Sequence, residues 1–326
     1  MKKLNLEELA LLAGVSKTTV SLILNGRAEQ YRISPATRER VLALAETHHF
    51  TPDANAASLR SGRDRSIGVV IPDYRHWPSM EWLAALEPLV RAQGEQLLIC
   101  CSHNDPALEL AAIRQLLARK VSGLLLMSVQ QSAAPLEFLP LAEVPLVVVG
   151  RYWPDSPLRQ FADGSAAAMT LLLGALLERL KPRHVVLLNG PEQQAEGQVR
   201  AAVLERALQG RVIQPLLSHG PDEASSAAAR LDLACEQLGT IPELLIASSS
   251  AQLEGALAFL TYHRNRWPAA LALACCEHQP LYRHLALPCF SLSPDWPRVA
   301  EAALALLAEP QGTTGPALRY QLHQPR

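Results

Sequence analysis

The stretch that decides the fold is Asn5–Gly26, which reads NLEELALLAGVSKTTVSLILNG. It predicts two short helices, because apolar residues recur at helical spacing in each half. Asn5 and Glu8 have the spacing of a capping box at the start of the first helix. Gly14 supplies the turn, since glycine adopts positive φ without a Cβ clash. The pattern favours a helix-turn-helix, although an ordinary helical hairpin carries the same local signals.

The second of these helices is predicted to run from Lys17 to Leu24. Val20, Ile23 and Leu24 form its apolar stripe. Its other face carries Lys17, Thr18 and Ser21, which are short or cationic and suit base edges and phosphates. We therefore expect this helix to lie in a DNA major groove.

A third helix is predicted from Ser34-Pro35, an N-cap followed by proline at the first helical position, to about His48. We expect Val41, Leu42 and Ala45 to face the first two helices. A polar, arginine-containing segment, residues 53–65, then leads to an apolar strand that begins at Ser66.

These segments resemble the head-piece of the LacI/GalR family of bacterial repressors. The residues that carry the resemblance are Leu9-Ala10, Ala13-Gly14-Val15-Ser16, Thr19-Val20-Ser21, Leu24-Asn25-Gly26, Ser34, Thr37-Arg38, Val41, Pro52, Ala56 and Leu59. The insertion 27–33 and the segment 59–68 resemble the fructose-repressor and sucrose-repressor branch.

The resemblance implies a set of DNA contacts. In the family, the segment matching 53–65 folds into a hinge helix on operator DNA and presses a leucine into the minor groove, where an apolar wedge bends the duplex. Asp53 stands where the family usually has asparagine, which weakens or alters this contact. The expected DNA-binding residues are Ser16, Lys17, Thr18, Thr19, Ser21, Leu22, Asn25, Ser34, Thr37, Ala56 and Leu59.

Composition narrows the class of protein. The chain has 326 residues, of which 49% are hydrophobic and 19% charged, and it lacks an apolar run long enough to span a membrane. The N-terminus has no secretory signal, which argues against a periplasmic sugar-binding protein. The six cysteines lack C-x-x-C spacing and fit buried thiols in a reducing cytoplasm. Residues 1–65 carry 10 Lys or Arg against 7 Asp or Glu, a basic end suited to DNA.

From residue 66 onward, apolar strands alternate with helices. This order predicts an α/β core of doubly wound parallel sheets covered on both faces. We expect a DNA-binding domain at 1–52, a hinge or linker at 53–65, and an effector-binding and dimerisation core at 66–326. The resemblance implies a periplasmic-binding-protein-like core with two lobes, about 66–160 with 294–326, and about 161–293.

The predicted assembly is a homodimer on an inverted-repeat operator. One short recognition helix covers only a few base pairs, and two-fold symmetry doubles the site. The tetramerising members of the family carry a leucine heptad tail, which is not found before Arg326.

The effector is expected at the carboxyl ends of the strands, between the lobes. Arg200 matches the family arginine that holds the effector, although Val203 replaces the glycine of that motif. Gly150 and His278 stand where the family has aspartates, so arginines outweigh carboxylates, and this favours an anionic effector such as a sugar phosphate. The same departures fit an unusual ligand, or none, equally well. The expected effector-binding residues are Asp73, Tyr74, Ser102, Ser128, Arg151, Asp163, Arg200, Ser249, Ser250 and His278.

No catalytic motif is found, and neither a cofactor nor a metal is expected. G-x-S-x-G, H-E-x-x-H and G-x-x-x-x-G-K are all missing from the sequence. A cytoplasmic transcriptional regulator of carbohydrate metabolism, controlled by a sugar or sugar phosphate, is the leading hypothesis. A sugar-binding module without DNA function, or a two-lobed sugar-phosphate enzyme, are the alternatives.

Overall fold

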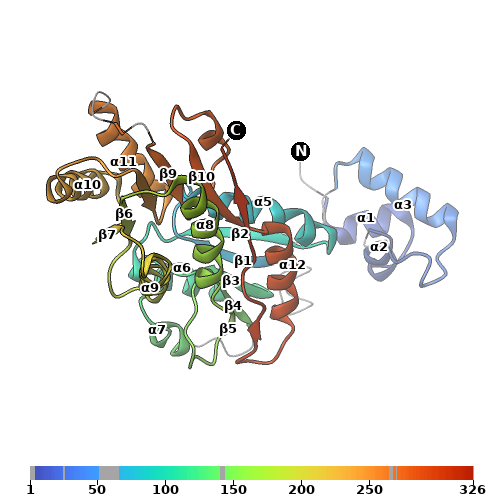
Figure 1. Cartoon of the computed structure of the whole chain (residues 1–326). Helices are drawn as coiled ribbons and strands as arrows, with labels where there is room; N and C mark the ends of the chain where they lie inside the picture. The colour runs from blue at the N-terminus through green and yellow to red at the C-terminus, as the bar shows by residue number, and fades with distance from the viewer. Residues whose placement is uncertain are drawn as a thin grey trace. The chain divides into compact units, whose positions relative to one another are not determined.

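The computed structural model describes residues 4–24, 26–50, 66–139, 144–263, 267–268 and 270–325. The chain divides into two compact units, Met1–Asp64 and Arg65–Arg326, which are coloured along the chain in Figure 1. The smaller unit is helical. The larger unit contains two six-stranded sheets with helices on their faces.

The small unit consists of α1 (Leu6–Ala13), α2 (Lys17–Leu24) and α3 (Pro35–Thr47). The predicted capping box is present, because Asn5 Oδ1 accepts from the Glu8 amide at 2.9 Å and Glu8 Oε2 accepts from the Asn5 amide at 2.8 Å. Gly14 ends α1 in the left-handed conformation, at φ 64°. Local sequence signals therefore set both ends of the first helix.

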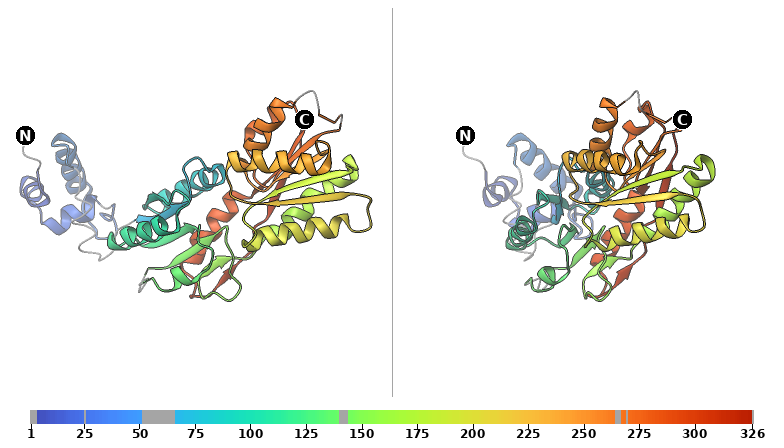
Figure 2. Two further views of the ribbon diagram at one scale, coloured as in Figure 1. Left: turned by 90° about the vertical axis from the view of Figure 1, so that its left-hand side faces the viewer. Right: turned by 60° about the vertical axis from the view of Figure 1, so that its left-hand side comes forward.

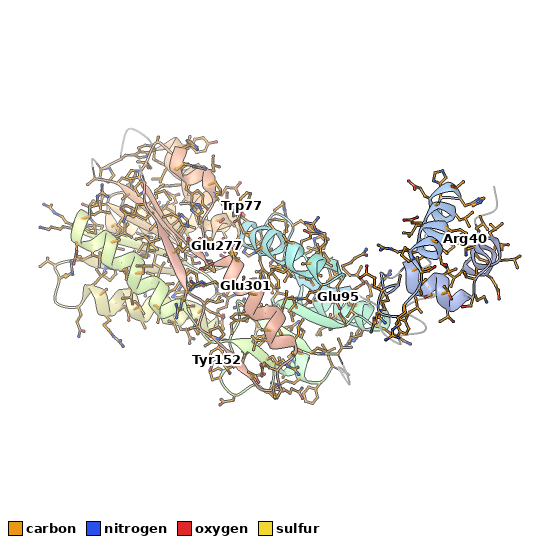
Figure 3. All side chains as sticks on the ribbon, turned by 90° about the vertical axis from the view of Figure 1, so that its right-hand side faces the viewer. Arg40, Trp77, Glu95, Tyr152, Glu277 and Glu301 are labelled. Carbon is orange, nitrogen blue, oxygen red and sulfur yellow. The ribbon has the colours of Figure 1, made fainter. Side chains whose placement is uncertain are left out.

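One apolar core holds the three helices together. Leu9, Val20 and Val41 are fully buried in it. Leu42 was predicted to face this core, but it is 40% exposed, because it lies one residue round α3 from Val41. Arg40 ties α3 to the turn by donating from Nε to the Ala13 carbonyl at 3.1 Å, and its side chain is labelled in Figure 3.

The first sheet of the large unit has the strand order β11-β5-β4-β3-β1-β2, and its pairs are parallel. Helices α5 and α12 cover one face and α6 and α7 the other. The bounds are β1 (Ser66–Ile71), β2 (Gln96–Cys101), β3 (Gly123–Met127), β4 (Leu146–Val149), β5 (Arg159–Phe161), β11 (Thr314–Gly315), α5 (Trp77–Ala92), α6 (Pro106–Ala118), α7 (Ala134–Glu137) and α12 (Trp296–Leu307).

The second sheet has the order β12-β10-β9-β8-β6-β7. Helices α8 and α9 cover one face and α10 and α11 the other, as the two views of Figure 2 show. The bounds are β6 (His184–Asn189), β7 (Gln214–His219), β8 (Leu244–Ala247), β9 (Ala272–Cys275), β10 (Cys289–Pro294), β12 (Tyr320–His323), α8 (Ser165–Leu180), α9 (Ala195–Leu208), α10 (Ala224–Leu238), α11 (Ser250–Tyr262) and the 3₁₀ helix η2 (Pro280–His284).

The last strand lies in a different lobe from the one predicted. The sequence assigned 294–326 to the first lobe, and α12 and β11 do lie there. However, β12 pairs antiparallel with β10 in the second sheet. The chain thus crosses between lobes after β5, after β10 and after β11. Gly164 lies where two crossings meet, and a Cβ there would clash with the Leu318 carbonyl.

Candidate DNA-binding surface and effector cleft

The surface of α2 carries the residues predicted to contact DNA. Lys17 and Thr18 are exposed, whereas Ser21 and Leu22 are partly buried. Lys17 forms an ion pair with Glu7 of α1. Asn25, Ala56 and Leu59 were also predicted to contact DNA, and they lie outside the described residues.

Ser16 and Ser34 occupy equivalent places at the starts of α2 and α3. Ser16 Oγ accepts from the Thr19 amide at 3.1 Å, and Ser34 Oγ accepts from the Thr37 amide at 3.2 Å. In both pairs the two hydroxyls also hydrogen-bond each other at 2.8 Å. The N-terminus of a helix attracts anions through its free N–H groups and its dipole. These two starts are therefore chemically suited to backbone phosphates.

The second predicted site is a cleft of about 1630 Å³ in the large unit, with walls from both lobes. It lies at the carboxyl ends of the strands, as expected for doubly wound sheets. The predicted residues that line it are Asp73, Ser128, Arg151, Arg200, Ser249, Ser250 and His278.

Three predicted residues do not line this cleft. Ser102 is buried, and its hydroxyl donates to the Ile71 carbonyl at 3.3 Å. The Asp163 carboxylate accepts from the Ser165 amide at 2.8 Å, at the start of α8. Tyr74 is 52% exposed on the loop after β1. A position after a strand was thus insufficient to predict a cleft residue, because local backbone groups bind two of these side chains.

Arg200 is oriented by Asn189, the last residue of β6. Arg200 Nε donates to Asn189 Oδ1 at 3.2 Å, and Asn189 Nδ2 donates to the Gly197 carbonyl at 2.8 Å. The rest of the guanidinium lines the cleft near Asp222. Burial raises the pKa of Asp222 above its ordinary value of 3.8, although a hydrogen bond from Ser249 at 2.7 Å opposes this.

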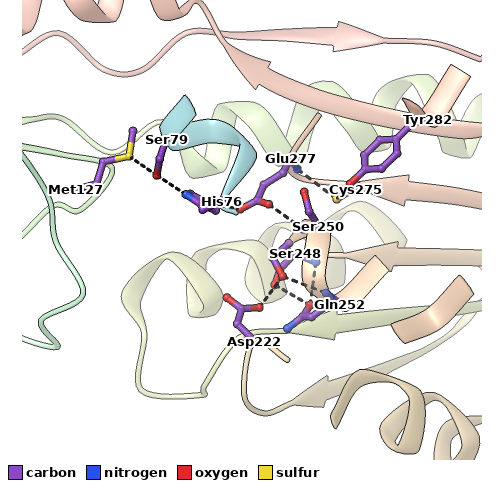
Figure 4. Close-up of polar contacts among 11 residues, drawn as sticks. His76, Ser79, Met127, Asp222, Ser248, Ser250, Gln252, Cys275, Glu277 and Tyr282 are labelled. Atoms are coloured by element: carbon purple, nitrogen blue, oxygen red, sulfur yellow. Dashed lines mark hydrogen bonds and ion pairs between the residues drawn. The ribbon is translucent and has the colours of Figure 1, made fainter. Parts of the chain in front are cut away.

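Two charged contacts join the lobes across the cleft. Arg151 Nη1 lies 3.0 Å from Glu196 Oε2 of α9. His76 Nε2 lies 3.2 Å from Glu277 Oε1, as drawn in Figure 4. Figure 3 labels Glu277 and Trp77, the neighbour of His76, at the meeting of the lobes. Neither pair was predicted, because the two partners are 45 residues apart in the first pair and 201 residues apart in the second.

His278, predicted to bind the effector, lines the cleft as one of a stacked pair of histidines, and the sequence did not predict this pair. Its ring stacks on His323 at a centroid distance of 3.6 Å, and its Nδ1 lies 2.8 Å from Ser291 Oγ. Burial, with the nearby His323 and Arg283, lowers the pKa of His278 to about 4. Near neutral pH the pair thus presents an uncharged aromatic surface to the cleft.

The sequence of this chain is similar to those of known bacterial regulatory proteins. The family of bacterial regulatory proteins named after lacI matches residues 5–53. The sucrose operon repressor of Klebsiella pneumoniae is 31% identical over 314 residues, which cover 94% of this chain and 92% of that protein. The chain belongs to the LacI family. The fructose operon regulatory protein of Vibrio cholerae is 31% identical over 323 residues, which cover 98% of this chain and 96% of that protein. These two curated relatives confirm the predicted fructose- and sucrose-repressor branch.

Two solved structures share the fold of this LacI-family protein. The lac repressor dimer bound to operator and the anti-inducer ONPF has a TM-score of 0.81 at 20% identity, over 99% of this chain and 98% of that one. The Cra transcriptional dual regulator of Pseudomonas putida in complex with fructose 1-phosphate has a TM-score of 0.70 at 22% identity, over 80% and 98%. The predicted α/β core with a helix-turn-helix head is thereby confirmed.

The family also decides between the three function classes. The sucrose operon repressor and the fructose operon regulatory protein are regulators of transcription and not enzymes, which confirms the predicted transcriptional regulator over the enzyme alternative. The match of the head argues against a sugar-binding module without DNA function. Over the described residues, no three His, Cys, Asp or Glu side chains are grouped to hold a metal ion. Within the same ranges, no helix has the length and apolar character needed to cross a membrane.

The contact between His76 and Glu277 gives the LacI-family core a pH-dependent part of its stability. Burial alone lowers the pKa of His76, but Glu277, Asp222 and Asp73 raise it above the ordinary value of 6.5. Burial raises the pKa of Glu277, yet His76 and hydrogen bonds from His76 and Ser250 hold it below 4.5. The contact is fully formed between pH 4.5 and 6.5. It is lost as pH rises through the raised pKa of His76 or falls through the lowered pKa of Glu277.

We therefore expect the melting temperature of the core to fall from pH 6.5 to pH 9 by about 2–4 °C more in the native protein than in H76Q. Differential scanning calorimetry on the full chain measures this difference. H284Q, at an exposed histidine of η2, is the matched control and should behave as the native protein. Identical pH profiles for the native protein and H76Q would contradict the assignment.

Proposed function

We propose that this regulator is a homodimer that represses carbohydrate-metabolism genes and releases or binds its operator in response to a sugar or sugar phosphate. The observation that carries the proposal is the pairing of an exposed α2 surface with a two-lobed cleft that displays Arg200. The named relative acts on a sucrose operon, and the solved Cra structure holds fructose 1-phosphate. A cytoplasmic location follows from the DNA-binding function.

The proposed DNA contacts fall into two groups. Lys17 and Thr18, exposed on α2, would read base edges, and the charge of Lys17 would also attract the phosphates. Phosphates would be bound at the helix starts formed by Ser16 with Thr19 and by Ser34 with Thr37, together with Asn25. Because these phosphate contacts carry no base information, losing one should weaken all duplexes alike.

The hinge proposal concerns residues 53–65, outside the described ranges. By resemblance, Leu59 would enter the minor groove and Ala56 would lie beside it. Two such hinges, one from each subunit, need a dimer, and the lac repressor was solved as a dimer on its operator. A two-fold assembly also matches an inverted-repeat site.

Effector binding in the cleft is proposed to control operator binding by shifting the equilibrium between two arrangements of the lobes. A ligand moves such an equilibrium only by binding one arrangement more tightly than the other. Ligand-dependent order in residues 53–65 would then set operator affinity.

One experiment tests the whole proposal. Duplexes bound by the purified full chain are selected from a random pool, with and without fructose, fructose 1-phosphate and sucrose. We expect an inverted repeat to be enriched, and one of the sugars to change its recovery. Enrichment of no sequence over random competitor at moderate salt would overturn the proposal.

The ion pair of Lys17 with Glu7 leads us to predict an effect on affinity for DNA duplexes of any sequence. Both side chains are half or more exposed, at 50% and 69%. E7Q removes the competing carboxylate, so we expect tighter binding to specific and random duplexes alike, by about two- to fivefold at low salt. K17A should lower the slope of log K against log salt by about one. Fluorescence anisotropy over a salt series measures both, and a change confined to the operator would contradict a phosphate role.

A further inference from the structure

We propose that Glu196 is an internal competitor for the anionic group of the effector, bound to Arg151 in its place; this rests on the function proposed above. The sequence suggested that Arg151 is available to an anion. In the structure, the carboxylate of Glu196 already accepts from its guanidinium at 3.0 Å. A phosphate would need the same donor, because arginine binds both groups through the same planar N–H face.

The pair is largely shielded from water. The side chains of Arg151 and Glu196 are only 20% and 16% exposed. Arg151 is also fixed by its Nε, which donates to the Ser128 carbonyl at 3.3 Å. Because a shielded ion pair is screened less than a surface pair, its removal leaves an undercompensated guanidinium that attracts another anion.

The surroundings of Glu196 are themselves suited to an anion. Glu196 lies in the first turn of α9, and Gln194, the residue that precedes this helix, makes no side-chain capping bond. The free N–H groups and dipole at this end stabilise negative charge. When the Glu196 carboxylate moves away, a phosphate between Arg151 and the start of α9 would replace both of its favourable contacts.

Two other arginines line the cleft, and their surroundings differ from those of Arg151. Arg75 is paired with Asp73 at 3.0 Å, and Arg200 lies near Asp222. Glu109 of α6 also acts on Arg151, but its carboxylate is occupied by Ser128 Oγ at 2.9 Å and the Val129 amide at 2.6 Å. Glu196 is thus the carboxylate that an incoming phosphate must displace, and its role is to set the concentration at which a phosphorylated effector acts.

The decisive variant is E196Q, which keeps the size of the side chain and removes its charge. We expect full-length E196Q to bind fructose 1-phosphate about tenfold more tightly than the native protein, because the competing charge is gone. Affinity for fructose should stay within about twofold, since a neutral sugar does not need the guanidinium as an anion site. Isothermal titration calorimetry measures both ligands.

E223Q is the matched control. Glu223 lines the same cleft and is exposed at the start of α10. E223Q changes the net charge of the cleft by the same amount as E196Q, but it leaves the ion pair of Arg151 with Glu196 intact. An equal gain in E223Q would show a general charge effect and would overturn the proposal, as would unchanged or weaker fructose 1-phosphate binding by E196Q.

A double-mutant cycle adds a test that general destabilisation does not imitate. In the R151Q background, E196Q should have no effect on fructose 1-phosphate affinity, because the shared donor is gone. A persistent gain would contradict competition at Arg151. Operator affinity is measured on the same samples. If the protein binds its operator but does not bind fructose 1-phosphate, the competitor role of Glu196 is refuted and the proposed function is not. If the native protein shows no preference for an operator, the proposed function itself is refuted.

Discussion

V20D is expected to abolish operator binding while leaving the large unit folded. Val20 is fully buried at the centre of the small helical core. Among the described residues of this unit, no buried polar or charged side chain could pair with a carboxylate there, and its burial costs about 4 kcal/mol or more. A unit this small has little stability to spare. Its ratio of folded to unfolded molecules should fall by about a thousandfold, at 1.4 kcal/mol for each factor of ten.

Fluorescence anisotropy with the selected operator measures operator binding. Calorimetry of the same sample measures whether the large unit is folded. L11D is the control, because Leu11 lies on α1 but is 84% exposed. L11D should keep the head folded. If V20D bound operator as tightly as the native protein, the helix-turn-helix would not be the DNA-binding element.

R200A is expected to remove the response to effector and to leave operator binding intact. The guanidinium lines the cleft and is held in place by Asn189. A charge-assisted hydrogen bond to a ligand contributes about 1.5–3 kcal/mol. We therefore expect effector affinity to fall by roughly a hundredfold.

The matched control for this prediction is R206A on the same helix. Arg206 lies in the last turn of α9 and is exposed. R206A should titrate as the native protein in operator release with increasing sugar phosphate. Equal titration curves for R200A and the native protein would remove Arg200 from the effector site.

The head was predictable because its signals are local. Asn5, Glu8 and Gly14 determine the ends of α1 through neighbours within a few residues. Helix starts were less accurate where proline lies in the first turn. The sequence predicts two helices over 81–93 and 298–307, whereas α5 and α12 begin earlier, at Trp77 and Trp296. A proline in the first turn removes no helical hydrogen bond, so Pro78 and Pro297 are compatible with the earlier starts.

The chemistry of the cleft was less predictable because it depends on pairs distant in sequence. Arg151 was predicted to line the cleft, and it does, but its partner Glu196 was not anticipated. At the end of β9 the prediction chose His278, while the cross-lobe contact is made by Glu277. Both residues line the cleft, and the path of the loop determines which of them reaches the other lobe. Short β5 and β11 were also missed, because three and two residues show no periodicity.

The repeated crossing of the chain between the two lobes has a consequence for how the core folds during synthesis. The first lobe needs α12, and the second needs β12, so both lobes depend on residues 296–323. Neither can reach its final packing until residues 296–323 have been synthesised, and long-range pairings of this kind close slowly. A single proteolytic cut between the lobes would consequently not release two autonomous fragments.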